Sequence, residues 1–345
     1  MMEYDLSILR LLDANLNRAT EGLRVLEESA RMLLDNAVLS AKAKNIRHTL
    51  AEIIRSEPSL DRALLFARNS ETDVLKASII PSENTRSDVI SILHANAKRA
   101  TESIRSLEEY SKLISPTLGA QFKDVRFAVY SLEQHLVGFL TRSELTASPR
   151  IRLGFSLMIS QQTPTSTDFL AVARDLKAGY VVLHGETLSD RAFIDVAGKW
   201  VTEARKAGVM MFIEHRLDVA LASGADGLFV HSDDIPPERC RQIGGVKLLI
   251  GYCAEPDSSL PSRWDDIDLF ILVSKNLDKL PTQSEVIPEE NRTPFLVRGF
   301  WTPERLEQTD LASLDGVLIE SSFGEGTESP VSLSLLRPVL KRLWM

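Results

Sequence analysis

The sequence is poor in several features that mark special classes of protein. Its only cysteines are Cys240 and Cys253, and two thiols alone make neither a disulfide framework nor a four-ligand zinc site. No apolar run approaches the roughly 20 residues that span a membrane, and the start "MMEYDLSILR" is unlike a signal peptide. A net charge of −8 argues against nucleic-acid binding. We therefore expect a cytoplasmic protein with no membrane or nucleic-acid partner.

The overall composition is that of an ordinary globular protein. The chain has 345 residues, a length that favours two domains over one. Hydrophobic residues make up 44% and charged residues 26%, so a buried core can form.

A repeated segment dominates the first part of the chain. The stretch "DANLNRATEGLRVLEE" begins at Asp13, and "HANAKRATESIRSLEE" begins at His94, 81 residues later. In each copy apolar residues recur at alternating steps of three and four, which predicts one buried stripe along a long helix. A second periodic segment follows each copy. We expect an all-α helical bundle of two repeated hairpins over residues 1–142, followed by a polar linker over 143–150. The two stripes comprise Leu9, Leu12, Leu16, Ala19, Leu23, Leu26, Ala30 and Leu33, and Ile90, Leu93, Ala97, Ala100, Ile104, Leu107, Ser111 and Ile114.

Polar residues of the repeat also recur in register. Arg24 with Glu28, and Arg105 with Glu109, have the spacing of ion pairs within a helix, which favours a structural polar layer. The alternative is an anion pocket between the two copies, with forked arginine donors. Its lining would be Asn15, Arg18, Asn96 and Arg99.

A polar connector joins the two hairpins. The stretch "SEPSLDRALLFARNSETDVLKASIIPSENTRSDV" is long for a connection, and long ordered loops are often functional. Arg68, Thr72 and Asp73 are candidates to face the same pocket.

The pattern changes after residue 150. Short apolar runs now alternate with helical segments, which predicts a (β/α)8 TIM barrel over residues 151–345. The overall class is thus α+β with two domains. In such barrels the chemistry lies at the carboxyl ends of the strands. The expected strands are "IRLGFSLMIS", "GYVVLHG", "VMMFIEH", "GLFVHS", "KLLIGYC", "LFILVSK", "PFLVRGF" and "GVLIESS".

Two segments carry a family resemblance. The stretch "IEHRLDVALASGADGLFVHSDDIP" resembles the thiamine phosphate synthase family, whose pattern there runs I-N-D-R-x-D-x-A-x-x-x-G-A-D-G-V-H-L-G-Q-x-D-x-P. Residues 13–31 resemble the helical domain fused ahead of that synthase in some bacteria, which is thought to act as an alternative hydroxymethylpyrimidine phosphate kinase. The resemblance implies a transferase of thiamine biosynthesis, phosphorylated pyrimidine or thiazole ligands, Mg²⁺, and ATP at the helical domain.

The chain departs from this family where a diphosphate would bind. The family joins a pyrimidine diphosphate to a thiazole phosphate and expels pyrophosphate. Its Gln-x-Arg-x-Lys pattern after the second strand is replaced here by Val182, His184 and Glu186. Its Asn-Asp pair, whose Asp holds Mg²⁺, is replaced by Glu214 and His215, which leaves Asp234 as the metal residue in register. These changes remove cations and predict weak synthase activity.

The remaining candidates come from the strand ends. We expect Glu214, His215, His184 and Lys275 as catalytic groups, with His and carboxylate side chains as acid–base pairs. The loops after strands seven and eight are the usual phosphate site of such barrels. The candidates there are Arg298, Gly299, Ser321 and Ser322, although Gly299 also suits a simple turn.

Three functions remain open at this point. The first is the synthase that the resemblance implies. The second is a phosphate-binding barrel without synthase activity, joined to a helical domain that handles pyrimidine phosphate or holds a homo-oligomer together. The third is an isomerase like the thiazole tautomerases, which need acid–base residues but no diphosphate site.

Overall fold

A computed structural model describes residues 5–68, 85–147, 149–159, 166–185, 188–256, 258–277, 280–288, 291, 293–322 and 338–340. The chain divides into two compact units, residues 1–140 and residues 141–345, and each is considered by itself. Among the described residues, no helix combines the length and apolar character that crossing a bilayer requires.

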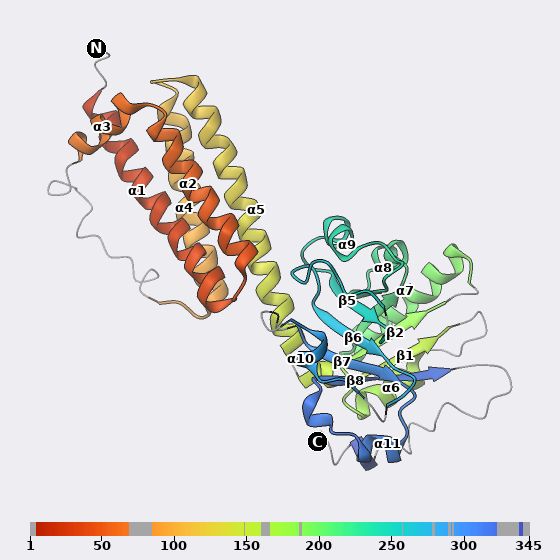
Figure 1. Ribbon diagram of the computed structural model, residues 1–345. Helices are drawn as coiled ribbons and strands as arrows, with labels where there is room; N and C mark the ends of the chain where they lie inside the picture. Colours follow the sequence, from red (N-terminus) through yellow and green to blue (C-terminus); the bar gives the residue numbers. More distant parts are fainter. Residues whose placement is uncertain are drawn as a thin grey trace. The chain divides into compact units, whose positions relative to one another are not determined.

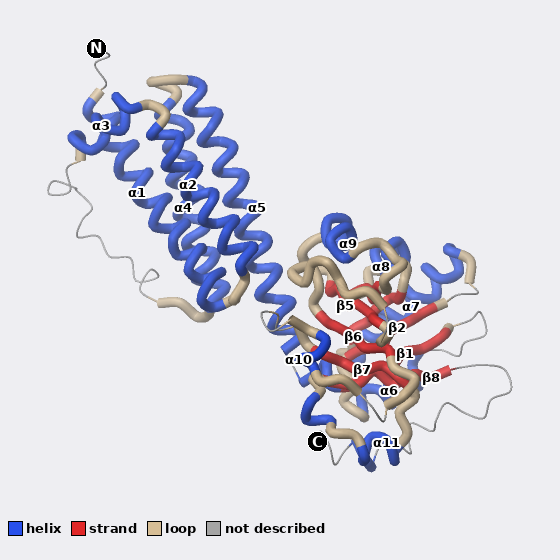
Figure 2. The backbone as a smooth tube through the Cα atoms, in the orientation of Figure 1, coloured by secondary structure: helices blue, strands red, loops and turns tan. Residues whose placement is uncertain are grey.

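The first unit consists of helices that lie alongside one another (Figures 1 and 2). Both copies of the repeat are helical, and their apolar stripes are buried as predicted: Leu23 and Ile104 are fully inaccessible to solvent. The helix that carries the second copy begins with a capping box made by Asp88 and Ser91. The elements are α1 (Leu6–Glu28), the π-helix η1 (Ser29–Leu33), α2 (Ala37–Arg55), α3 (Pro58–Ala67), α4 (Val89–Ser111) and α5 (Pro116–Ala147).

A glycine lets α1 and α4 approach closely. A Cβ atom added to Gly22 would lie 2.8 Å from the main-chain oxygen of Asn96 and 3.3 Å from the Cβ of Ala100. Glycine disfavours a helix by about 1 kcal/mol relative to alanine, so this contact explains why the position is not larger. Ser103, the equivalent residue of the second copy, is also small and buried.

The first stripe ends earlier than predicted. Residues Ser29–Leu33 form a π-helix, in which the wider turn changes the register of the side chains. Leu33, expected on the buried stripe, is consequently 60% exposed.

The connector between the hairpins contains a helix that its polar composition did not predict. In α3, Leu60 and Leu64 are buried against the bundle. Arg68 follows this helix and binds both oxygens of Asp13, at 2.9 and 2.7 Å. Thr72 and Asp73 lie outside the described residues.

The second unit is a closed barrel of eight parallel strands that pair in sequence order. The predicted eight-stranded barrel is confirmed. The strands are β1 (Leu153–Met158), β2 (Tyr180–His184), β3 (Met210–Glu214), β4 (Gly227–Val230), β5 (Leu249–Ala254), β6 (Leu269–Val273), β7 (Phe295–Gly299) and β8 (Gly316–Ser322). The helices are α6 (Ser166–Asp175), α7 (Asp190–Ala207), α8 (Leu217–Ser223), α9 (Pro237–Gly244), α10 (Gln283–Val286) and α11 (Pro303–Gln308), with 3-10 turns η3 (Pro149–Arg152) and η4 (Leu311–Ser313).

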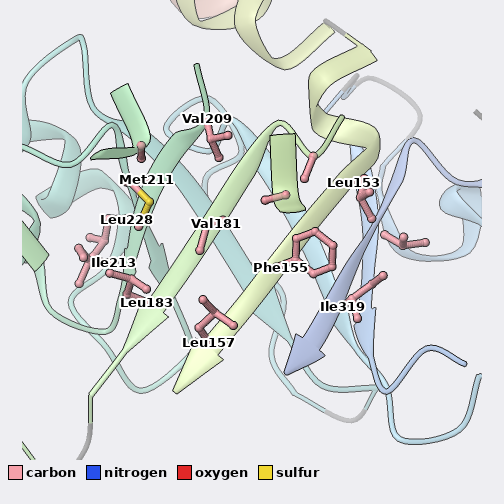
Figure 3. Packing of buried hydrophobic residues seen from close by; sticks show 14 of the residues in the cluster. Leu153, Phe155, Leu157, Val181, Leu183, Val209, Met211, Ile213, Leu228 and Ile319 are labelled. Atoms are coloured by element: carbon pink, nitrogen blue, oxygen red, sulfur yellow. The ribbon is translucent and has the colours of Figure 1, made fainter. Parts of the chain in front are cut away.

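Alternation along the strands separates two apolar cores. Phe155, Val181 and Ile213 belong to the larger core between the strands and the outer helices, part of which Figure 3 shows. The neighbouring Val182 and Phe212 belong to a second core, which fills the barrel interior. This alternation decides which residues at the strand ends face the inside of the barrel.

The segment expected as a linker is largely helical. Residues 143–147 form the end of α5, and the 3-10 turn η3 begins at Pro149.

Candidate functional site at the barrel mouth

Polar side chains from several strands meet at the carboxyl end of the barrel. Every second side chain of a strand faces the same side of the sheet. Each of these residues either belongs to the interior core or lies two positions after one of its members, and therefore points inward. The inward residues at or near the strand ends are His184 of β2, Glu214 of β3, Cys253 of β5, Arg298 of β7 and Glu320 of β8.

Glu214 is at the centre of this group. Its side chain is almost fully buried, with 3% of the residue exposed. One of its oxygens accepts a hydrogen bond from an Nη atom of Arg298, and Arg298 Nε donates to Glu320 Oε1 at 2.8 Å. Arg298 thus bridges two carboxylates across the mouth of the barrel.

Two histidines lie beside Glu214. His231 follows β4, and its Nε2 atom is 2.8 Å from Glu214 Oε1. The His215 ring stacks on the His231 ring, with centroids 4.4 Å apart and an interplanar angle of 22°. Asp234 Oδ2 lies 2.8 Å from His215 Nδ1 and also accepts a hydrogen bond from the main-chain N–H of His231. The turn after β4 therefore holds both imidazoles in place.

The backbone at His215 is strained. Its φ angle is 63°, in the left-handed region that side-chain-bearing residues rarely adopt. The main-chain N–H of His215 still donates to Phe229 of β4, at 2.8 Å. Strain of this kind costs of order 1–3 kcal/mol and concentrates at functional sites.

The cluster shifts the pKa values of its members. Burial alone would raise the pKa of Glu214, but the hydrogen bonds and charges of His231 and Arg298 outweigh burial and lower the pKa to about 2. Burial would lower the pKa of His231, but Cys253 and Glu214 raise it to about 10. The pKa of the Cys253 thiol is raised, mainly by burial. Without a bound ligand, Glu214 is therefore ionised, and the thiol of Cys253 is neutral.

Three of these groups are close enough to share a metal ion. One ligand atom each from Glu214, His215 and His231 can be chosen so that all three lie within 4.8 Å of one another. His215 is the most exposed of the three, so the group opens to solvent on its side.

The expected site residues divide between this cluster and its surroundings. Glu214, His215, Asp234 and Arg298 lie in the cluster. The charge of His184 reaches Glu214 and contributes to its lowered pKa. Lys275 is exposed beyond the end of β6.

The expected phosphate residues lie on β7 and β8. Gly299 ends β7, and a Cβ there would lie 2.8 Å from the main-chain oxygen of Ser274, so a close backbone approach also explains this glycine. Ser321 and Ser322 are the last residues of β8 and pair in register with Leu157 and Met158 of β1.

Sequence reasoning missed the part played by His231. From this segment the sequence analysis selected only Asp234, whereas His231 itself binds Glu214 and stacks on His215. Cys253 and Glu320 were noted only as strand ends. The alternation of inward and outward residues was the available signal for both of them.

The expected pocket of the helical unit shows matching local contacts in both copies. Asn15 Nδ2 donates to the Leu11 carbonyl and Asn96 Nδ2 to the Ile92 carbonyl, each at 2.9 Å. Arg18 and Arg99 are both exposed. Within the described residues we find no ion pair for either guanidinium.

The polar layer of the repeat is built around two buried carboxylates. The predicted pairs Arg24–Glu28 and Arg105–Glu109 are present, at 2.7 and 2.9 Å. In addition, Glu27 binds Arg24 and Arg47, and its counterpart Glu108 binds Arg105 and Arg126. The same arrangement thus occurs twice, with the second arginine supplied by α2 in one copy and by α5 in the other.

Comparison with known proteins gives two family matches. The ThiD2 family matches residues 10–135, and the family described as thiamine monophosphate synthase matches residues 157–263. The two matches cover the helical repeat and much of the barrel in turn.

Individual proteins agree with these matches. A protein of Rhodopirellula baltica named thiamine-phosphate synthase is 33% identical over 253 residues, which are 71% of this chain and 65% of that protein. The chain therefore spans slightly less than two thirds of that relative. A thiamine-phosphate synthase of Gloeobacter violaceus is 33% identical over 244 residues, 71% of this chain and 68% of that protein. Among solved structures, thiamine phosphate pyrophosphorylase from Pyrococcus furiosus is 20% identical with a TM-score of 0.45, covering 56% of this chain and 97% of that one.

The order of the two matched regions, and an identity of about one third sustained across both units, have one explanation: the chain belongs to the thiamine-phosphate synthase family.

Proposed function

We propose that this chain acts in thiamine biosynthesis, and that its barrel binds a phosphorylated thiazole or pyrimidine without carrying out efficient pyrophosphate-releasing synthesis. The observation behind this proposal is the state of Arg298. Its side chain is 9% exposed and its guanidinium is bound by Glu214 and Glu320, so its charge is already matched by carboxylates.

A leaving diphosphate needs positive charge that is free to bind it. Negative charge develops on the leaving group in the transition state, and cations or metal ions at the mouth normally stabilise it. Two unit charges about 4 Å apart interact by about 4 kcal/mol at an effective dielectric constant of 20. Here Val182 and His184 stand where the family carries polar and cationic side chains, and Glu214 faces the same space. Because a carboxylate faces the space where the family's cations attract the diphosphate, release of pyrophosphate at this site should be slow.

The residues present do not fit the family's Mg²⁺ ion. Magnesium prefers an octahedral shell of oxygen atoms from carboxylates, phosphates and water. Where the family has its first Mg²⁺-binding aspartate, this chain has the imidazole of His215. At the second metal-binding position Asp234 is present, but its Oδ2 atom is already bound to His215 and to the His231 main chain. We therefore assign no step of a reaction to Mg²⁺ at this site.

A direct assay tests the proposal. The full chain is supplied with the pyrimidine diphosphate, thiazole phosphate and Mg²⁺, and thiamine phosphate is measured. Separately, calorimetry measures binding of thiazole phosphate and of hydroxymethylpyrimidine phosphate. We expect binding of at least one of these ligands and little or no thiamine phosphate. Turnover typical of a synthase would overturn the proposal, and so would failure of both phosphorylated compounds to bind.

A second candidate is an isomerase on the same barrel. The pairing of His215 with Asp234, at 2.8 Å, has the geometry of an imidazole oriented by a carboxylate. An isomerase of a thiazole phosphate needs such a pair and no diphosphate site. Incubation with thiazole phosphate in deuterated water, followed by mass spectrometry for exchanged hydrogen, distinguishes this candidate from a barrel that only binds its ligand.

For the helical unit we infer a pyrimidine phosphate ligand near Asn15, Arg18, Asn96 and Arg99. Support comes from the exposure of both arginines and from the close approach of α1 and α4 at Gly22. ATP is the phosphoryl donor that the resemblance implies, and formation of ADP from ATP and hydroxymethylpyrimidine phosphate tests it. A unit that only holds a homo-oligomer together would form no ADP and bind no pyrimidine phosphate.

A further inference from the structure

We propose that Glu214, His215 and His231 form a binding site for a divalent transition-metal ion, of the class of Zn²⁺ or Co²⁺, where the family holds Mg²⁺. This inference concerns the metal alone and does not depend on which reaction the barrel performs.

The geometry of the three donors supports this site. All three ligand atoms lie within 4.8 Å of one another, and the Glu214–His231 pair is already at 2.8 Å. A tetrahedral ion with bonds of about 2.0–2.1 Å places its ligand atoms about 3.4 Å apart. The three donors therefore lie close enough to share one ion after a modest adjustment of the exposed His215 side chain.

Asp234 supports the first histidine in the way that metal sites require. A histidine that binds a metal through one nitrogen usually donates its other ring N–H to a carboxylate, which fixes the tautomer and the ring orientation. The Nδ1 atom of His215 is 2.8 Å from Asp234 Oδ2, so Nε2 is the nitrogen left for a metal. Asp234 thus changes from a metal ligand in the family to a residue that orients one.

The strained backbone is an independent sign of a ligand site. His215 adopts a left-handed conformation, with φ of 63°, although the residue is not glycine. That conformation turns its side chain away from the strand and onto the ring of His231, at 4.4 Å between centroids. Strained backbone of this kind concentrates at ligand sites, and here it places the His215 ring between Asp234 and the ring of His231.

The charges around the cluster also call for a cation. The guanidinium of Arg298 is bound by the carboxylates of Glu214 and Glu320, and a third carboxylate, that of Asp234, lies beside His215. The carboxylates outnumber the positively charged groups of the cluster, which favours a bound cation. Two imidazole nitrogens and one carboxylate are a donor set of Zn²⁺, Co²⁺ and related ions, whereas Mg²⁺ prefers oxygen.

Cobalt binding provides the test. The full chain, with any polyhistidine tag removed and metal stripped by a chelator, is titrated with Co²⁺ while the visible absorption of four-coordinate cobalt is recorded. We expect one equivalent to bind with such bands, Zn²⁺ to displace it, and Mg²⁺ in large excess to leave it bound. An absence of bound cobalt, or its displacement by Mg²⁺, overturns the proposal.

Variants assign the ligands. His231→Ala and His215→Asn should each abolish stoichiometric binding; asparagine is chosen because it tolerates the left-handed backbone. Asp234→Asn should weaken binding by about 10- to 100-fold, as loss of an orienting carboxylate does. His94→Ala removes an exposed imidazole of the helical unit, outside the proposed set, and should bind cobalt like the wild type; circular dichroism checks that each variant is folded. Wild-type affinity in folded His231→Ala, or an equal loss in His94→Ala, contradicts the assignment.

Discussion

Both units of the molecule bury glutamates that are bound by arginine, but the surroundings of these glutamates differ. In the helical unit, Glu27 and Glu108 each bind two arginines, and both sites have the same contacts. In the barrel, Glu214 binds one arginine and one imidazole, beside a second imidazole on a strained backbone.

This difference separates a structural role from a functional one. In each copy two arginines bind two glutamates, so the charges are matched, and this arrangement suits the joining of helices. The barrel site has excess negative charge, a left-handed histidine and an opening toward solvent, which suits a ligand. The predictions below test whether the two kinds of site respond differently to substitution.

The largest effect is expected from Arg298→Met. This change leaves Glu214 buried with one hydrogen-bond partner fewer and no guanidinium, and loss of one partner of a buried ion pair typically costs about 3–5 kcal/mol. All four tryptophans of the chain, Trp200, Trp264, Trp301 and Trp344, lie in residues 141–345, so tryptophan fluorescence during urea unfolding reports on the barrel.

A double variant serves as the control for this change. Arg298→Met combined with Glu214→Leu removes both charges and should regain most of the lost stability, because an apolar pair of similar volume replaces a buried ion pair at little cost. If the single variant unfolds like the wild type, Glu214 is not held by Arg298 in solution.

A smaller and duplicated effect is expected in the helical unit. Arg47→Met and Arg126→Met each remove one charged hydrogen bond to a buried glutamate, at 2.9 Å in both copies. Each should lower the free energy of unfolding by about 1.5–3 kcal/mol. Far-ultraviolet circular dichroism, which weights the helices, is the measurement. Clearly unequal losses in the two variants would show that the two copies are not energetically equivalent.

Much of the fold followed from periodicity in the sequence. The repeats predicted the long helices, and the eight apolar runs predicted eight strands within a few residues of their ends, because burial imposes periods of 3.6 and 2 directly. The helix α3 was missed because the connector as a whole is polar, although the segment of α3 is mostly apolar and buries Leu60, Leu64 and Ala67. The π-turn was missed because the apolar spacing continues unchanged through Ala30 and Leu33.

The candidate site was less predictable. Strand ends identified Glu214 and Arg298 separately, but their pairing depends on the register of strands that lie far apart in the sequence. The position of His231 depends on a turn held by Asp234. The left-handed backbone at His215 could not be predicted from the sequence, because histidine rarely adopts that conformation. Alternation along each strand would have selected the inward residues, but not their partners.

A third prediction compares two glycines in the middle of helices, one in each unit. Gly22→Ala puts a Cβ 2.8 Å from a main-chain oxygen of α4, and overpacking of this kind costs about 1–3 kcal/mol. Gly198→Ala in α7 has no atom within 4 Å of the new Cβ, so it should stabilise the barrel by about 1 kcal/mol through helix propensity. Urea unfolding of both variants measures the difference. A stabilised Gly22→Ala would show that α1 and α4 lie farther apart than the structure places them.

The smallest effect on stability is expected from Arg18→Ala and Arg99→Ala. Both side chains are exposed, and neither forms an ion pair within the described residues, so the melting temperature should stay unchanged or rise slightly as like charges are removed. The same variants should lose binding of hydroxymethylpyrimidine phosphate in calorimetry, because forked guanidinium donors suit a phosphate.

Lys98→Ala is the matched control: Lys98 precedes Arg99 on α4 and is exposed, and its contact with Glu102 is a long 3.8 Å. That variant should bind like the wild type. A lowered melting temperature together with no binding by the wild type would assign Arg18 and Arg99 to the structural layer, alongside the glutamate sites of the repeat.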